Sequence, residues 1–137
     1  MQFVGDAVMG VFGAPIPQDD HAQKAVEAAI QMHVAQFRVN QQWQDAGAPA
    51  FHLGIGLSTG KVAAALLGSE QRLEYSVVGD SVNLAQRLQQ FAEGGQTVLS
   101  RPTFESLSAP PPVVELPPQK VKGRRAEVHA FLMKETQ

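Results

Sequence analysis

The stretch Leu73-Glu-Tyr-Ser-Val-Val-Gly-Asp-Ser-Val-Asn-Leu-Ala-Gln-Arg-Leu88 carries the strongest structural signal in this chain. Its first half is rich in β-branched and aromatic residues, which predicts a strand from Leu73 to Val78. Gly79-Asp80 then marks a turn, and an amphipathic pattern predicts a helix from about Asp80 to Ala92 with Asp80 as its N-cap. The stretch therefore predicts a strand that passes directly into a helix.

Asn83 and Arg87 stand four residues apart on this predicted helix, so their side chains stack on one side, one turn apart. A guanidinium presents a planar fork of donors that matches phosphate oxygens, and an amide can donate to or accept from a hydroxyl. Together they could hold a nucleoside triphosphate by its phosphates and ribose. Solvated residues at the border of an amphipathic helix show the same pattern, so the spacing alone leaves both interpretations open.

The composition is that of one globular domain: 137 residues, 44% hydrophobic, 18% charged and a net charge of −2. This balance argues against a nucleic-acid partner, which would need clustered Lys and Arg. The lack of cysteine excludes disulfides and thiolate metal sites. No apolar run approaches the roughly 20 residues that span a bilayer. We therefore expect a cytoplasmic chain without a membrane segment.

The residues before Leu73 predict a hairpin, a long helix and two strands. Short apolar runs around Gly5-Asp6 predict the hairpin within residues 1–13. A helix is expected from Asp19 or Asp20 to about Gln44. Its apolar stripe comprises Ala22, Val26, Ala29, Ile30, His33 and Phe37. The strands are expected at Phe51–Thr59 and Val62–Leu67.

The residues after Ala92 predict a strand at Thr97–Ser100, a short helix at Pro102–Leu107, an irregular segment or edge strand within Ala109–Pro118, and a strand at Val128–Met133. Hairpins that alternate with helices favour an α+β fold. We expect helices packed on one face of a mainly antiparallel sheet.

Asp6 and the basic run Val121-Lys-Gly-Arg-Arg125 are further candidates for phosphate chemistry. A carboxylate between two strands can bind Mg²⁺ together with substrate phosphates, but Asp is also a common turn residue. The basic run could place a cation against a polyphosphate, or it could be a solvated turn. From the residues alone, both alternatives stay open at each position.

The run Gly54-Ile-Gly-Leu-Ser-Thr-Gly-Lys61 does not match a phosphate-binding loop. Such a loop has four residues between its first Gly and Gly-Lys, whereas the spacings here are three or five, and Val62 follows the lysine. Close backbone packing within the sheet is the favoured interpretation of these glycines. The four histidines show no metal-ligand spacing, and His33, on the helical stripe, is expected to be a satisfied core or interface residue.

Taken in order, several segments resemble the catalytic domain of the class III nucleotidyl cyclases, the adenylyl and guanylyl cyclases. The matching segments are Phe3-Val-Gly-Asp-Ala-Val-Met9, Phe12-Gly-Ala-Pro15, Asp20-His-Ala22, Gly54-Ile-Gly-Leu-Ser-Thr-Gly60, Gly68-Ser69, Glu74-Tyr-Ser-Val-Val-Gly-Asp-Ser-Val-Asn-Leu-Ala-Gln-Arg87 and Val121-Lys-Gly123. The resemblance covers nearly the whole chain. It implies a ferredoxin-like α+β fold over residues 1–137. The N-terminal part of the family domain, which holds its first strand and helix, is expected to be missing.

The resemblance also implies an activity and a catalytic pair. Family members convert ATP or GTP to a 3′,5′-cyclic nucleotide and pyrophosphate in intracellular signalling. Asn83 matches the Asn that orients the ribose, and Arg87 matches the Arg that stabilises charge on the phosphates. Asp6 matches the second of two aspartates that bind a pair of Mg²⁺ or Mn²⁺ ions. The first aspartate has no counterpart in this chain.

Substrate contacts are implied at three more positions. Gln2 and Ser76 occupy the two base-reading positions, and Arg124 falls where the family often has a Lys that contacts the triphosphate. The amide of Gln2 can donate and accept, and Ser76 is equally permissive, so either purine could bind. Guanine readers of the family usually carry an acidic residue at the position of Gln2, which leans the choice toward ATP.

Family active sites form between two catalytic domains, so the resemblance implies a homodimer or a heterodimer with a second cyclase domain. With one metal aspartate, the 137-residue chain is expected to be inactive alone. The alternative is a non-catalytic, cyclase-like module that dimerises or binds nucleotide and regulates a complete partner.

Overall fold

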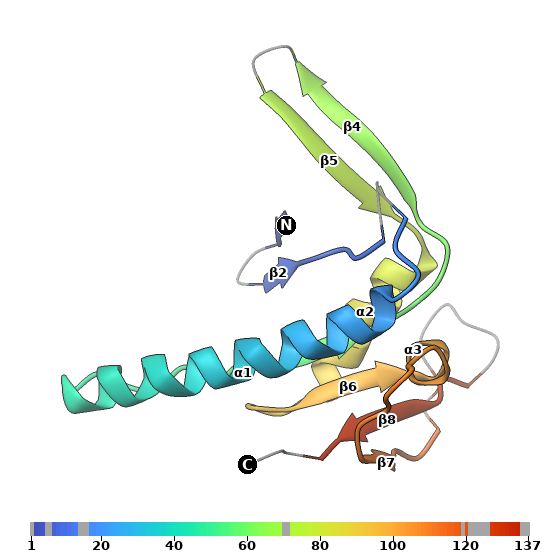
Figure 1. Cartoon of the computed structure of the whole chain (residues 1–137). Coiled ribbons are helices and arrows are strands. Elements are labelled where there is room, and N and C mark those ends of the chain that lie inside the picture. The colour runs from blue at the N-terminus through green and yellow to red at the C-terminus, as the bar shows by residue number, and fades with distance from the viewer. Residues whose placement is uncertain are drawn as a thin grey trace.

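The computed structural model describes residues 2–4, 7–13, 17–69, 72–118, 120 and 127–134, without the side chains of residues 2–4, 63–69 and 72–78. Three helices and eight strands lie within these residues (Figure 1). In chain order they are β1 (Gln2–Val4), β2 (Ala7–Met9), α1 (His21–Asp45), β3 (Ile55–Leu57), β4 (Ala63–Ser69), β5 (Arg72–Val78), α2 (Asp80–Phe91), β6 (Thr97–Ser100), α3 (Arg101–Glu105), β7 (Val113–Glu115) and β8 (Ala130–Met133).

The strands form one four-stranded sheet and two hairpins. The sheet has the order β3-β6-β8-β7, in which β3 and β6 are parallel and the other pairs antiparallel. β1 pairs with β2, and β4 with β5, each antiparallel. The β4–β5 hairpin projects away from the four-stranded sheet (Figure 1). The predicted α+β class and mainly antiparallel pairing are confirmed, and residues 113–115 form the edge strand.

The prediction that the helices pack on one face of the sheet is wrong. Neighbouring residues of β6 belong to different clusters, since Val98 packs with Leu88 of α2 and Leu99 packs with Val26 of α1. Successive side chains of a strand point to opposite faces. The four-stranded sheet is therefore a central layer with α1 on one face and α2 on the other. All four residues of β6 are buried, as expected for a strand covered on both sides.

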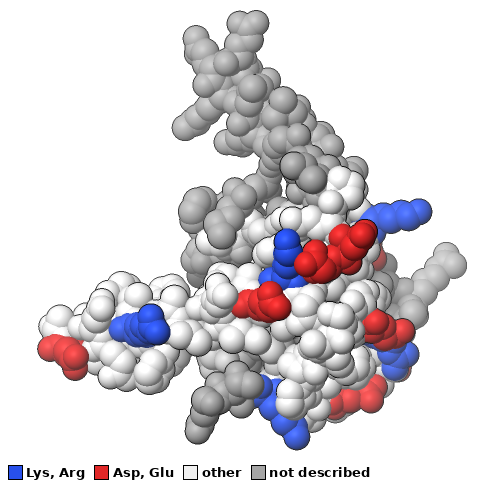
Figure 2. Space-filling model, viewed as in Figure 1, with Lys and Arg blue, Asp and Glu red and all other residues white. Residues whose placement is uncertain are grey.

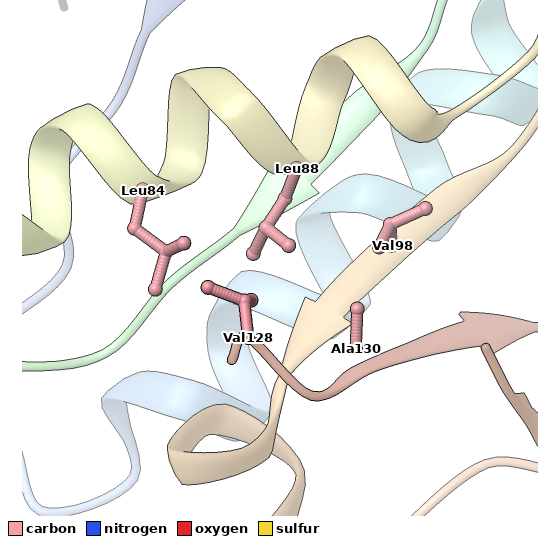
Figure 3. Packing of buried hydrophobic residues seen from close by; sticks show 5 residues of the cluster. All are labelled: Leu84, Leu88, Val98, Val128 and Ala130. Carbon is pink, nitrogen blue, oxygen red and sulfur yellow. The ribbon is translucent and has the colours of Figure 1, made fainter. Parts of the chain in front are cut away.

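The core between α2 and the sheet is built from a small group of apolar side chains. Figure 3 shows Leu84 and Leu88 pointing from the helix toward Val98, Val128 and Ala130. Leu88 and Val98 are fully buried. This contact fixes which side of α2 faces the sheet and therefore which side faces outward.

The first half of α1 packs on the other face of the sheet, and its second half extends beyond the sheet (Figure 1). Ala22, Val26 and Ala29 are buried as the stripe predicts, but Phe37, the last residue of the predicted stripe, is 65% exposed. His33 lies between these regions, with its Nε2 2.9 Å from the Thr97 hydroxyl. This confirms His33 as a satisfied, part-buried residue.

The strand predicted from Phe51 to Thr59 is shorter, because only Ile55–Leu57 pairs with β6. The backbone of Phe51 bonds a side chain instead of a strand. Asn40 Nδ2 donates to the Phe51 carbonyl at 2.8 Å, and the Phe51 N–H donates to Asn40 Oδ1 at 2.8 Å. The side-chain amide of Asn40 thereby satisfies the Phe51 backbone groups that a neighbouring strand would otherwise bind.

The short helix α3 depends on Ser100, which ends β6 and caps the helix. Ser100 Oγ accepts a hydrogen bond from the Thr103 N–H at 3.3 Å and lies 2.9 Å from Thr103 Oγ1. We expect Ser100→Ala to lower the free energy of unfolding by about 1 kcal/mol, because an N–H at the helix start loses its acceptor. Urea unfolding measures the change.

Ser106→Ala is the matched control for Ser100→Ala. The Ser106 hydroxyl donates to the Pro102 carbonyl at 2.7 Å but is exposed, so its loss should change stability by no more than about 0.5 kcal/mol. Equal decreases in the free energy of unfolding for Ser100→Ala and Ser106→Ala would contradict the importance of the cap.

Candidate active site

The strand–helix unit predicted from residues 73–88 is present as β5 followed by α2. Gly79 joins them at φ +156° and ψ +165°, a backbone conformation that side-chain-bearing residues rarely adopt. Gly79 is the N-cap and Asp80 the first helical residue, so the prediction that Asp80 caps the helix is wrong. A carboxylate in the first turn still interacts favourably with the helix dipole.

Asn83 and Arg87 are both exposed on α2, one turn apart, as the spacing predicts. Leu84 and Leu88 hold the neighbouring side of the helix against the sheet, so the pair lies on an outward-facing side. Arg87 Nη1 donates a long hydrogen bond of 3.4 Å to Gln90 Oε1. An exposed guanidinium beside an exposed amide can present donors to a phosphate and to a hydroxyl.

The opposite side of α2 lies against the backbone of β3. A Cβ built on Gly56 would lie 2.3 Å from the Ala85 carbonyl oxygen and 2.4 Å from the Gln89 nitrogen. The helix therefore rests directly on the strand at this point. The sequence predicts that the glycines of the run Gly54–Lys61 pack closely against other backbone within the sheet. The structure shows that the close neighbour of Gly56 is the helix.

A surface hollow of about 300 Å³ lies at the N-terminal end of α2. Asp80, Ser81, Arg101 and His129 contribute to its lining, together with Ser100. Neither Asn83 nor Arg87 lines this hollow. The predicted catalytic pair is thus separate from this concavity.

The remaining predicted site residues are only partly covered by the structure. Gln2 lies in β1 opposite Met9, and Ser76 lies in β5 opposite Ala65, but both side chains are outside the described part. Asp6 and Arg124 lie outside the described residues. The assignments of Asp6 as a metal ligand, of Arg124 as a triphosphate contact, and of Gln2 and Ser76 as base readers stay predictions.

Among the described residues, no group of three or more His, Cys, Asp or Glu side chains is placed to hold a metal ion. Asp6, the predicted ligand, is outside this set.

The charges on the surface are mixed. On the face in Figure 2, Lys and Arg side chains are separated from one another, and Asp and Glu lie among them. Exposed pairs such as Lys24–Asp20 at 3.9 Å and Arg101–Glu115 at 3.7 Å contribute to this pattern. Within the described residues, no helix has the length and apolar character needed to cross a membrane.

Known proteins similar to this chain include adenylate and guanylyl cyclases. The family model for the adenylate and guanylate cyclase catalytic domain matches residues 1–135. An adenylate cyclase of Mycobacterium tuberculosis (strain ATCC 25618 / H37Rv) is 36% identical over 103 residues, which cover 75% of this chain and 22% of that protein. The chain thus corresponds to about a fifth of this relative.

Two solved structures share the fold. The adenylyl cyclase CyaB from P. aeruginosa superposes with a TM-score of 0.88 at 29% identity, covering 99% of this chain and 71% of that chain. The guanylyl cyclase Cya2 superposes with a TM-score of 0.82 at 36% identity, covering 88% of this chain and 61% of that one. These matches confirm the predicted nucleotide cyclase fold. The chain belongs to the family of adenylate and guanylate cyclase catalytic domains.

Proposed function

We propose that this chain contributes Asn83 and Arg87 to a nucleotidyl cyclase active site shared with a second cyclase domain. The observation that carries the proposal is the placement of these two side chains, exposed and one turn apart on a helix whose opposite side is packed against the sheet. A pair on the surface of a packed helix can reach a substrate held mainly by a partner domain.

The two side chains have distinct roles in the proposed reaction. The ribose 3′-hydroxyl attacks the α-phosphorus, the bond to the pyrophosphate oxygen breaks, and the hydroxyl proton is released. Asn83 hydrogen-bonds the ribose and orients the hydroxyl for attack. Arg87 donates to phosphate oxygens as negative charge develops on them, an electrostatic contribution typical of phosphoryl transfer.

A divalent ion, Mg²⁺ or Mn²⁺, would neutralise triphosphate charge, and Asp6 is its proposed ligand in this chain. We propose ATP as the substrate, since Gln2 is not the acidic residue expected of a guanine reader and relatives of this chain are named adenylate cyclases. The relatives also include a guanylyl cyclase, so GTP belongs in the test. With one of the two metal aspartates, the 137-residue chain alone is proposed to be inactive.

Complementation tests the proposal. The chain is mixed with a full-length adenylate cyclase homologue whose own Asn and Arg at these positions are replaced by Ala, with Mn²⁺ and either ATP or GTP. We expect each protein alone to give no product and the mixture to give cyclic AMP. The double variant Asn83→Ala/Arg87→Ala of this chain is the matched control and should restore nothing.

Other outcomes would decide against the proposal. Dimers without product, seen by size-exclusion chromatography, would favour the alternative of a non-catalytic regulatory module. Absence of dimers would contradict a shared site. Cyclic GMP in place of cyclic AMP would keep the shared site and report the base preference of the partner domain, which holds most of the substrate in this mixture.

A further inference from the structure

The contact between Gly56 and α2 sets how closely the helix approaches the sheet. An added Cβ would meet the Ala85 oxygen at 2.3 Å, the Gln89 nitrogen at 2.4 Å and the Leu88 carbonyl carbon at 3.0 Å. All three are backbone atoms of α2, so no side chain can rotate away to make room. The Ala85 oxygen and Gln89 nitrogen are four residues apart, the spacing of a helical hydrogen bond, so the strand faces the helix backbone itself.

The strand is held more firmly than the helix at this contact. β3 pairs with β6 through Ile55–Leu57, and further backbone bonds flank it, from Ile55 N to the Gln96 oxygen at 3.0 Å and from Gly95 N to the Leu53 oxygen at 2.7 Å. Leu57 packs on the opposite face, in the cluster of Val26. α2 is held against the sheet chiefly by the side chains of Leu84 and Leu88. A side chain at position 56 would therefore displace the helix.

The displacement has a defined direction and size. Side chains of a strand stand roughly perpendicular to the sheet, so a methyl group on residue 56 pushes α2 outward. Relaxing a 2.3 Å approach to an ordinary contact of 3.4 Å requires a movement of about 1 Å. Asn83 and Arg87 lie on the side of the helix away from Gly56 and would move outward with it.

We propose that Gly56 is a positioning residue for Asn83 and Arg87, because its missing side chain lets α2 approach the sheet closely enough to place both groups correctly. The link to activity rests on the proposed cyclase function. The placement of α2 does not, and it can be measured separately.

The first measurement is a distance across the sheet. The chain has no cysteine, so Gln31→Cys on α1 and Gln86→Cys on α2, both exposed and on helices that cover opposite faces, can be spin-labelled specifically. Pulsed electron paramagnetic resonance should show the mean distance between the labels increasing by about 1 Å in Gly56→Ala. No change in a folded Gly56→Ala variant would overturn the proposal.

The second measurement is activity in the complementation mixture. Misplacing reacting groups by about 1 Å can cost about 10²-fold, so Gly56→Ala should lower kcat about 10²-fold at saturating chain concentration. A variant that is merely unstable would regain full kcat when more chain is added at low temperature. Full recovery of that kind, or a longer distance with unchanged kcat, would overturn the positioning role.

Two glycines in the same chain provide matched variants. Gly10→Ala meets no atom of the described residues within 4 Å and should change neither the distance nor kcat. Gly54→Ala meets the Ala92 oxygen at 3.0 Å, a milder contact at the end of α2, and should lower kcat only a few-fold. If Gly56→Ala does not fold even with sucrose, which favours compact states, an unaltered kcat in Gly54→Ala would overturn the proposal.

If the unmodified chain restores no activity, the proposed function fails. The label distance in Gly56→Ala would still decide whether Gly56 sets the position of α2. The two failures are therefore distinguishable.

Discussion

Arg87→Ala is expected to reduce cyclic nucleotide formation in the complementation mixture by about 10³-fold. An arginine that stabilises charge on a transferring phosphoryl group contributes about 10³-fold or more to the rate. Arg87 is exposed and its one described hydrogen bond, to Gln90, is 3.4 Å long, so the substitution should leave the fold intact. Initial rates at saturating chain concentration measure the loss.

Two variants make this prediction specific. Arg87→Lys keeps the charge but loses the planar fork of donors, so it should retain more activity than Arg87→Ala and less than the unmodified chain. Arg38→Ala removes an exposed arginine from α1, a different helix, and should leave the rate unchanged. A rate loss for Arg38→Ala equal to that for Arg87→Ala would show that total charge, and not the position of Arg87, is responsible.

Elements with a strong local signal were predicted well from the sequence. The strand and helix on either side of Gly79 are present as β5 and α2, with bounds within one residue of those predicted. The exposed pair on α2 follows from helical spacing, which depends on local geometry alone. His33 was also placed correctly, because a polar residue on an apolar stripe usually finds a partner.

The errors concern arrangements that depend on residues far apart in the sequence. The apolar stripe of α1 continues to Phe37, but the second half of the helix extends beyond the sheet (Figure 1) and Phe37 is exposed. A short strand such as Thr97–Ser100 does not reveal what covers each face, and the coverage by α1 and α2 on opposite faces was missed. Gly56 signalled a close approach but not which element approaches.

Leu88→Ala is expected to lower the free energy of unfolding by about 2–5 kcal/mol, the range for removing a buried leucine side chain. Leu88 is fully buried against Val98, Val128 and Ala130 (Figure 3). β6 is fixed by pairing with β3 and β8, so the wall of the cavity cannot move inward to fill it. Urea unfolding should show a lower midpoint with an unchanged m-value.

Val34→Ala is the matched control. It truncates a half-exposed apolar side chain on α1 and should change the free energy of unfolding by no more than about 0.5 kcal/mol. A loss below about 1 kcal/mol for Leu88→Ala would mean that α2 is not packed on the sheet as described, and the fixed position of Asn83 and Arg87 would lose its physical basis.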